Sequence, residues 1–276
     1  MGLGSVKVGG KKFNVKKELG LTRLGIYDMD IKDIKEIKGL DKLKDLESLD
    51  LSNNQITEIT GLDSLSNLKQ LFLNNNQLTE LKGLDSLTKL DRIFLKGNQI
   101  TELKGLDQLK SLQWIEIQKS KITEIKGLDN LTELIQLDLG ENQITEIKGL
   151  EGLTNLQVLR LNRNQITEIK GLDSLTSLHS LRLDHNKIEE IKGLDSLTNL
   201  ETLYLDANQI TEIKGLENLT KLETLYLDTN QITEIKGLSH LEKLKLLFLG
   251  FNPIEGDFEK DMMGVENIKK FLSSYK

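Results

Sequence analysis

Apolar residues recur along this chain with a period of 22 positions. In the segment LETLYLDANQITEIKGLENLTK, residues 200–221, leucines at 200, 203 and 205 are followed by apolar residues at 210, 213, 216 and 219. The alternation at 203 and 205 predicts a short strand with one buried face, and the later spacing of three predicts a return segment. Self-similarity at such a period is typical of a solenoid, in which each coil buries its apolar side only against its neighbours.

One polar residue follows the same period. An asparagine closes every regular LxxLxLxxN segment but one, in which Ser120 stands at this position. The asparagines are Asn54, Asn76, Asn98, Asn142, Asn164, Asn186, Asn208, Asn230 and Asn252. A carboxamide both donates and accepts hydrogen bonds, so it can pair with backbone groups of a turn that no strand reaches. The series therefore predicts a ladder of amides. Glycine also recurs once per coil, as at Gly215, where we expect a close approach of the next coil or a positive φ.

The pattern LxxLxLxxNxIxxIxxLxxLxx resembles the 22-residue class of leucine-rich repeats. That class includes bacterial internalins and the leucine-rich regulatory subunit of a nuclear protein phosphatase. The resemblance covers Leu24 to Ile254. It implies an α/β repeat solenoid, an arc with a concave parallel β-sheet and a convex side of 3-10 or extended segments. It also implies an interaction module that binds other proteins.

The two ends of the chain depart from the repeat, and we interpret them as caps of a single leucine-rich-repeat domain, residues 1–276. Residues 1–23 are predicted to form a hairpin cap around Gly9-Gly10. Residues 24–254 are eleven 22-residue repeats, the first degenerate, with Tyr27 and Met29 at strand core positions and Lys32 in place of asparagine. Residues 255–276 are predicted to form a helical cap, from the helical spacing of Val265, Ile268, Phe271, Leu272 and Tyr275.

The composition and charge of the chain argue against several classes of function. The chain of 276 residues has a net charge of −6 and shows no basic face, which disfavours a general nucleic-acid role. It has no cysteine, so disulfides and thiolate chemistry are excluded. No apolar run approaches membrane-spanning length. We expect a cytoplasmic monomer with a protein partner of unknown identity, without cofactor and without nucleic-acid or membrane partners.

The informative positions are the third and fifth of LxxLxLxxN, which alternation directs into the hollow of the expected arc. In the first unit these positions are predicted to be Ile26 and Asp28. Over all coils they hold six of the 12 aromatic residues of the chain, and contiguous aromatics on such a surface are typical of an interface. The predicted partner-binding residues are Phe72, Arg92, Phe94, Trp114, Glu116, Asp138, Arg160, Arg182, Tyr204, Tyr226 and Phe248. The alternative is a purely structural role, in which the aromatic side chains only stabilise the sheet by cross-strand stacking.

Two sharper hypotheses concern the second half of the chain. Asp184, Asp206 and Asp228 fall in one column at the strand exits and are a candidate Ca²⁺ site, although solvated aspartates are the simpler interpretation. His179, Ser180 and His185 near Asp184 have the residue types of acid–base or nucleophilic catalysis. An open arc offers no pocket that excludes water, so no enzymatic activity is expected. The sequence thus favours a protein–protein interaction scaffold that binds its partner on the concave face. A structural or consensus-like scaffold with no dedicated binding site is the alternative, and an enzyme the third.

Overall fold

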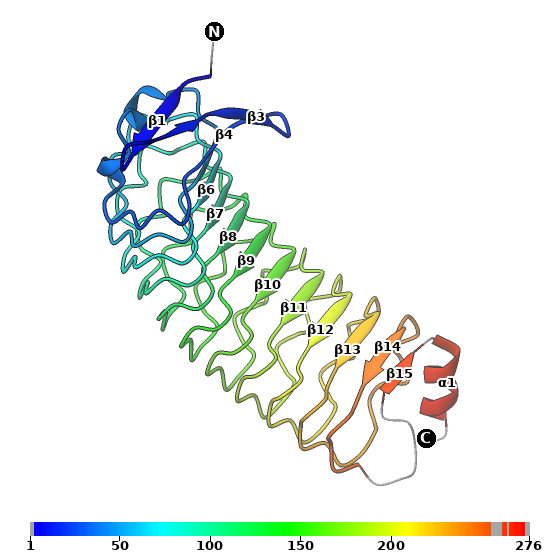
Figure 1. Ribbon diagram of the computed structural model, residues 1–276. Coiled ribbons are helices and arrows are strands. Elements are labelled where there is room, and N and C mark those ends of the chain that lie inside the picture. The colour runs from blue at the N-terminus through cyan, green and yellow to red at the C-terminus, as the bar shows by residue number, and fades with distance from the viewer. Residues whose placement is uncertain (1–2, 255–260, 264, 274–276) are drawn as a thin grey trace. The chain divides into compact units, whose positions relative to one another are not determined.

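The computed structural model describes residues 3–254, 261–263 and 265–273. The chain divides into two compact units, Met1–Asn142 and Gln143–Lys276, called unit 1 and unit 2 below. Each unit is a repeat solenoid with short strands on one side and return segments on the other (Figure 1). The predicted single-domain organisation and its boundaries stay a prediction.

Unit 1 begins with two antiparallel strand pairs. The first pair, β1 (Ser5–Val8) and β2 (Lys11–Asn14), turns at Gly9 and Gly10, both with positive φ, and forms a sheet of its own. The second pair, β3 (Lys16–Glu18) and β4 (Leu21–Gly25), joins the main sheet. Two 3-10 turns follow, η1 (Ile34–Glu36) and η2 (Leu40–Lys42). Asp33 and Glu36 form a reciprocal capping box at η1, which pairs backbone N–H groups that the turn leaves over.

The predicted register of the first coil is wrong by three residues. Strand β4 pairs with β5 (Ser48–Asp50) so that Arg23 lies opposite Ser48 and Gly25 opposite Asp50, a step of 25 residues. Ile26 is consequently in the core, fully buried, and Tyr27 is 56% exposed. The step is still 25 residues at Ile31, since Gln55 N donates to Ile31 O as Gln77 N donates to Ile56 O, and it returns to 22 at Gly39 and Gly61, both with positive φ. The three additional residues are thus absorbed between Ile31 and Gly39, around η1.

The ladder position of the first coil shifts by the same three residues. Met29, and not Lys32, stands 25 residues before Asn54. The backbone N–H groups of Met29 and Ile31 each donate to Asn54 Oδ1 over 3.1 Å. Asn54 therefore completes the first coil from the second, and the first coil needs no asparagine of its own.

The regular strands of each unit are parallel and three residues long. Their middle residue is buried, and most of the first and third residues are partly exposed on what we call the outward face of the sheet. Such alternation follows from the two-residue period of a strand. In unit 1 they are β5, β6 (Gln70–Phe72), β7 (Arg92–Phe94), β8 (Trp114–Glu116) and β9 (Gln136–Asp138). In unit 2 they are β10 (Val158–Arg160), β11 (Ser180–Arg182), β12 (Thr202–Tyr204), β13 (Thr224–Tyr226) and β14 (Leu246–Phe248).

The return segments are chains of tight turns. In one coil, Leu65 N donates to Leu62 O and Leu68 N donates to Leu65 O, both over 2.9 Å, and all three leucines are fully buried. Bonds between residues three apart are the 3-10 pattern. The side opposite the sheet thus has the 3-10 or extended character that the repeat pattern implied.

The amide ladder confirms the role predicted for asparagine. Asn208 Oδ1 accepts a hydrogen bond of 3.0 Å from Ile188 N, and its Nδ2 donates to the carbonyl oxygens of Leu183 and Leu205 over 3.0 Å each. These backbone groups belong to buried residues, where an unpaired polar group costs free energy. Gly215 has φ of 72°, and a Cβ there would lie 2.3 Å from Ile191 O, so both reasons expected for glycine apply.

Unit 2 ends in a short strand and a helix. Strand β15 (Asp261–Met263) pairs antiparallel with β14, and helix α1 spans Val265–Ser273. Ile268 on the helix is 1% exposed. Tyr275, the last of the residues used to predict the helical cap, lies outside the described residues, and the capping role stays a prediction. Across the described ranges, no helix combines the length and apolarity needed to cross a bilayer.

Candidate functional site

The outward face carries two aromatic groups, one in each unit. Patch 1 consists of Phe72, Phe94 and Trp114 on β6, β7 and β8. Patch 2 consists of Tyr204, Tyr226 and Phe248 on β12, β13 and β14. All six side chains are partly exposed. The alternation rule thus placed them on the correct face, while their role in binding is a separate question.

Patch 2 is a continuous stack. Tyr204 and Tyr226 lie opposite one another in the strand register, as do Tyr226 and Phe248. Their ring centroids are 4.6 Å and 4.4 Å apart, with interplanar angles of 12° and 5°. The Arg182 guanidinium lies over the Tyr204 ring at 4.7 Å. Burial, followed by the neighbouring Tyr204 and Asp228, raises the pKa of Tyr226. Every ring face inside the stack is therefore satisfied by a neighbour.

Patch 1 starts as a stack and then breaks. Phe72 and Phe94 lie opposite one another, 4.6 Å apart and 4° from parallel. Trp114 lies opposite Arg92 and thus diagonal to Phe94, with a centroid distance of 6.1 Å and an interplanar angle of 47°. The cause is its place at the third position of the repeat, whereas both phenylalanines are at the fifth. Arg92 covers the tryptophan at 5.6 Å.

The indole N–H of Trp114 has no acceptor within the described structure, although the nitrogen is buried. Beside it, the Arg92 Nε lies 3.6 Å from Asp91 Oδ1, and burial raises the pKa of Asp91 despite the opposing effects of Arg92 and Lys69. Buried polar groups without partners cost about 1–3 kcal/mol each. The surroundings of Trp114 are thus less well satisfied than those of patch 2.

The predicted charged residues are distributed unevenly. Glu116 and Arg160 are partly exposed, each on the outward face of its own unit. Asp138 is only 2% exposed and accepts hydrogen bonds from Gly140 N and the Gln118 side chain. Its carboxylate therefore adds little accessible surface to the outward face.

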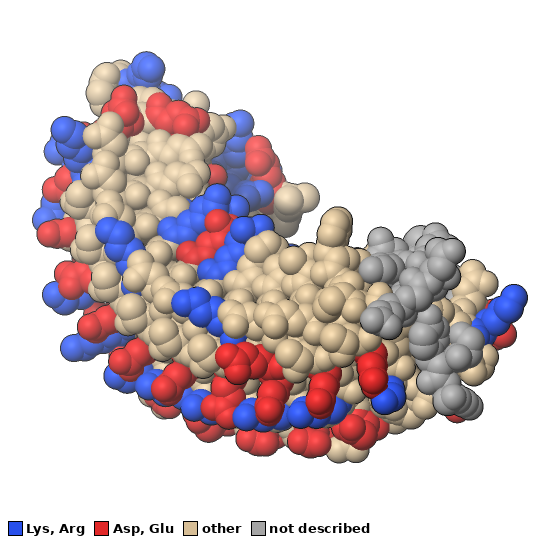
Figure 2. Space-filling view, turned by 90° about the horizontal axis from the view of Figure 1, so that it is seen from below, with Lys and Arg blue, Asp and Glu red and all other residues tan. Residues whose placement is uncertain are grey.

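Away from these residues, charges of opposite sign alternate, as Figure 2 shows along one edge of the surface. Many of them are Glu–Lys ion pairs between residues two apart in the sequence, such as Glu80 with Lys82 at 2.8 Å.

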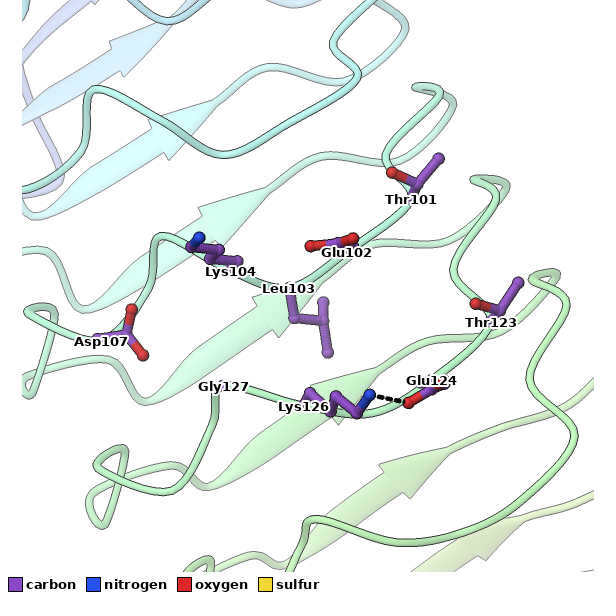
Figure 3. Close-up of a pocket in the computed structure, with 9 residues that line it drawn as sticks. All are labelled: Thr101, Glu102, Leu103, Lys104, Asp107, Thr123, Glu124, Lys126 and Gly127. Atoms are coloured by element: carbon purple, nitrogen blue, oxygen red, sulfur yellow. Dashed lines mark ion pairs between the residues drawn. The ribbon is translucent and has the colours of Figure 1, made fainter.

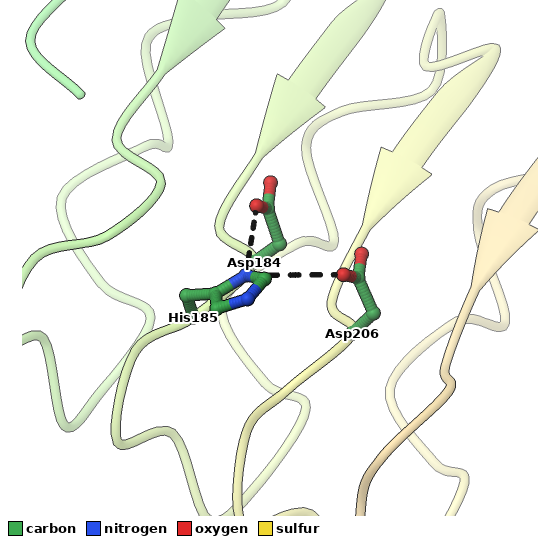
Figure 4. A group of neighbouring side chains, drawn as sticks. All are labelled: Asp184, His185 and Asp206. Atoms are coloured by element: carbon green, nitrogen blue, oxygen red, sulfur yellow. Dashed lines mark hydrogen bonds and ion pairs between the residues drawn. The ribbon is translucent and has the colours of Figure 1, made fainter. Parts of the chain in front are cut away.

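A charged cluster in unit 2 surrounds Asp184 (Figure 4). This carboxylate is 2% exposed and accepts from Arg182 Nε over 3.0 Å, and its other oxygen lies 3.2 Å from His185 Nδ1. Asp206 Oδ2 is 4.0 Å from the same nitrogen. Arg163 Nη2 lies 3.4 Å from His185 Nε2. Because arginine can only donate, the Arg163 contact matches the imidazole tautomer that carries its proton on Nδ1 and donates it to Asp184.

The cluster bears on two hypotheses from the sequence, the Ca²⁺ site and the catalytic site. Ligand atoms of Asp184, His185 and Asp206 lie within 4.8 Å of one another, and burial, then Asp184, raises the pKa of Asp206. The chain's own donors, Arg182 and His185, already occupy Asp184, so the geometry does not call for a metal ion. Asp228 accepts from Gly250 N over 3.0 Å instead. For the catalytic hypothesis, no hydrogen bond in the described chain joins His179 to Ser180 or Asp184.

The return side of unit 1 holds a hollow that sequence reasoning missed. It has a volume of about 310 Å³, with Leu103 as its apolar side chain and polar residues around it, including an ion pair between Glu124 and Lys126 (Figure 3). A Cβ on Gly127 would lie 3.6 Å from Leu103 O, against 2.4 Å for Gly105 and Leu81 O one coil earlier. A similar hollow one coil earlier shows that such grooves recur on this side.

Comparisons with known proteins agree with this architecture. A family model described as two copies of leucine-rich repeats matches residues 154–196 and 198–240, and a second leucine-rich-repeat model matches residues 25–124. No curated protein gives a significant sequence match.

Solved structures provide closer relatives. An internalin (InlF) from Listeria monocytogenes is 32% identical, with a TM-score of 0.73 over 84% of this chain and 74% of that one. Internalin C2 from the same species is 31% identical, with a TM-score of 0.55 over 76% of this chain and 80% of that one. The TLR13–ssRNA13 complex, 22% identical with a TM-score of 0.70 over 86% of this chain and 37% of that one, shows the fold alone. By its repeat, its amide ladder and these relatives, the chain belongs to the leucine-rich-repeat family.

Proposed function

We propose that this protein is an interaction scaffold that binds a protein partner on the outward face of its sheet, with patch 1 as the main anchor. Leucine-rich-repeat proteins are interaction modules, which supports the general role. The choice of face rests on the concentration of aromatics there, since six of the 12 occupy third and fifth positions of the repeat. Binding energy at interfaces concentrates in a few aromatic and arginine side chains.

The observation that carries the choice of patch 1 is Trp114. A stack that served only the sheet would resemble patch 2, where each ring covers the next. Trp114 instead tilts out of the stack by 47° and leaves its buried indole N–H without an acceptor in the described structure. A partner that packs on this patch would cover the exposed part of the ring together with Phe72 and Phe94, and a turn of the indole on binding would bring its N–H to a partner oxygen. The structural alternative accounts for patch 2 better than for patch 1.

The proposal also covers the location, the oligomeric state and the class of partner. The protein acts without catalysis or cofactor, as a cytoplasmic monomer, and its partner is a protein, with no nucleic-acid or membrane ligand. The charges of both signs interspersed along the edge seen in Figure 2 support this restriction. Cell fractionation and light scattering of the purified protein test the location and the monomeric state.

The binding test compares two triple variants. Phe72, Phe94 and Trp114 are replaced by alanine in one, and Tyr204, Tyr226 and Phe248 in the other. Affinity capture identifies proteins retained by the wild type, and calorimetric titration measures each variant against them. We expect the patch 1 variant to lose the partner and the patch 2 variant to keep most of its affinity, with both folded by circular dichroism. Full affinity of the patch 1 variant would refute the proposal.

A further inference from the structure

Ser120 interrupts the amide ladder in the middle of unit 1. In the coil before it, Asn98 Oδ1 accepts from Leu78 N over 3.0 Å, and Asn98 Nδ2 donates to Leu73 O and Leu95 O over 3.0 Å and 2.8 Å. One period later, the corresponding backbone groups are Ile100 N, Leu95 O and Ile117 O. These three residues are fully buried. A serine hydroxyl replaces an amide that would have bonded to all three groups.

The hydroxyl does not take over those bonds. Ser120 Oγ is buried and has no hydrogen-bond partner in the described structure, and no described residue accepts from Ile100 N. Leu95 O receives one amide N–H, from Asn98 Nδ2, and Ile117 O also receives one, from Asn142 Nδ2 over 2.7 Å.

A regular coil shows what is missing. Leu205 O receives two amide N–H groups, from Asn208 over 3.0 Å and Asn230 over 2.9 Å. The coil of Ser120 therefore retains one buried donor, two carbonyl oxygens with spare acceptor capacity, and one hydroxyl. Together they surround the place of a single absent carboxamide.

The coil of Ser120 is also spaced more widely from the preceding coil on the return side. The return segments on either side stay apart, since a Cβ on Gly127 would lie 3.6 Å from Leu103 O, while the same measure is 2.3–2.7 Å at Gly171, Gly193, Gly215 and Gly237. The proposed site itself is polar, and a serine side chain fills less of it than an asparagine side chain would.

We infer that Ser120 creates a specific binding site for one buried water molecule, which stands in for the absent amide. The water accepts from Ile100 N–H, donates to the carbonyl oxygens of Leu95 and Ile117, and uses its second lone pair for the Ser120 hydroxyl. Buried waters make about three hydrogen bonds and need two to four polar partners in a polar space, and this site offers four. The part of a carboxamide that serine lacks is close in volume to one water molecule.

The chemistry of the site selects water over an ion. No charged side chain contributes to it, and a buried ion without an opposite charge would pay a large desolvation cost. A cation would leave Ile100 N–H unpaired, and an anion would face two carbonyl oxygens. Only a ligand that both donates and accepts matches the four groups.

The test follows water and amide protons in the intact protein by NMR. In the wild type, we expect a cross-peak between the Ile100 amide proton and a water molecule of long residence time. In Ser120→Asn the amide side chain displaces the water, so the cross-peak disappears and exchange of the Ile100 amide slows by about tenfold or more. A high-resolution crystal structure of the wild type would show the oxygen within hydrogen-bond distance of the four groups.

Asn208→Ser is the matched variant, because it places the same defect in a regular coil. Ile188 N–H, which donates to Asn208 in the wild type, should gain a water cross-peak there. This gain keeps the test decisive if Ser120→Asn does not fold. Electron density without the water, with the Ser120 hydroxyl bonded directly to the Leu95 or Ile117 carbonyl, would overturn the inference. So would an Ile100 amide without a water cross-peak in the wild type.

Discussion

Two coils, one in each unit, carry the same 22-residue repeat and differ at matched positions. In unit 2, Asn208 bonds to three backbone groups, and the following Gly215 would place a Cβ 2.3 Å from Ile191 O. In unit 1, Ser120 bonds to none, and Gly127 would place its Cβ 3.6 Å from Leu103 O. The regular coil is held by its ladder and packs tightly behind it. The coil of Ser120 lacks its own ladder amide and this close approach, although Asn142 of the next coil still bonds to Ile117 O.

The outward faces of the same coils also differ. The regular coil contributes Tyr204 to a stack whose rings stay within 12° of parallel. The coil of Ser120 contributes Trp114, tilted by 47° from Phe94. Ladder, coil spacing and ring packing thus depart from the regular pattern in one coil. Folding does not demand this, because the neighbouring coils satisfy the same core without it, so the departure favours a role in binding.

The largest expected effect concerns glycine on the return side. In Gly215→Ala the new methyl group meets a backbone oxygen at 2.3 Å and keeps a positive φ, so we expect a loss of about 3 kcal/mol or more. Gly127→Ala is the control, at an equivalent position with φ of 82° but ordinary contact distance, and should cost only the conformational strain of about 1–2 kcal/mol. Urea unfolding measures both. Equal losses would mean that the coil spacing does not differ in solution.

The ladder gives the next effect. Asn208→Ala leaves Ile188 N–H without its acceptor and the carbonyls of Leu183 and Leu205 with one amide donor fewer. We expect a loss of about 1–3 kcal/mol in the free energy of unfolding. Ser120→Ala is the control, in a coil that never had the amide, and should lose less. If the unfolding midpoint of Asn208→Ala stayed at the wild-type value, the ladder would not stabilise the fold.

The aromatic comparison concerns binding. Trp114→Ala should weaken partner affinity by about 2 kcal/mol or more while it leaves the fold intact, because it removes the anchor of patch 1. Tyr226→Ala, in the middle of patch 2, should weaken affinity less. Calorimetric titration against the captured partner gives both values, and thermal unfolding controls for stability. A larger loss for Tyr226→Ala would move the centre of the interface to unit 2.

The smallest expected effect is a dependence on pH at the start of unit 1. Glu47 accepts from Lys69 Nζ over 2.7 Å and from Thr22 N over 3.0 Å, and these bonds lower the pKa of Glu47 from 4.5 to about 2. The folded state therefore favours the ionised form. Its stabilising contribution is complete above pH 4.5 and is lost as the pH falls toward 2.

Glu47→Gln should flatten this acid limb of a stability–pH curve, and added salt should weaken the effect because the pair is partly exposed. Glu223→Gln is the control, since Glu223 pairs with Lys245 at the same 2.7 Å in unit 2. An unchanged acid limb in Glu47→Gln would show that the carboxylate bonds equally well to water in the unfolded chain.

Much of the fold was predictable because the repeat is local and strict. The 22-residue period placed Leu203 and Leu205 in the core, Asn208 in the ladder and Tyr204 on the outward face, and all four predictions are confirmed. Each follows from alternation along a strand and from identical neighbours one period away. Even the diagonal place of Trp114 follows from its third position in the repeat.

The first coil shows where such reasoning fails. It has only one regular neighbour, so its register was set by the pairing of β4 with β5. The three additional residues fit into the segment around η1, which the 22-residue period does not predict. The burial of Asp138 and the tilt of Trp114 are of the same kind. Periodic contacts repeat from coil to coil and can be read from the amino-acid sequence. Side-chain orientation depends on which particular residues meet across neighbouring strands, and only the tertiary structure decides it.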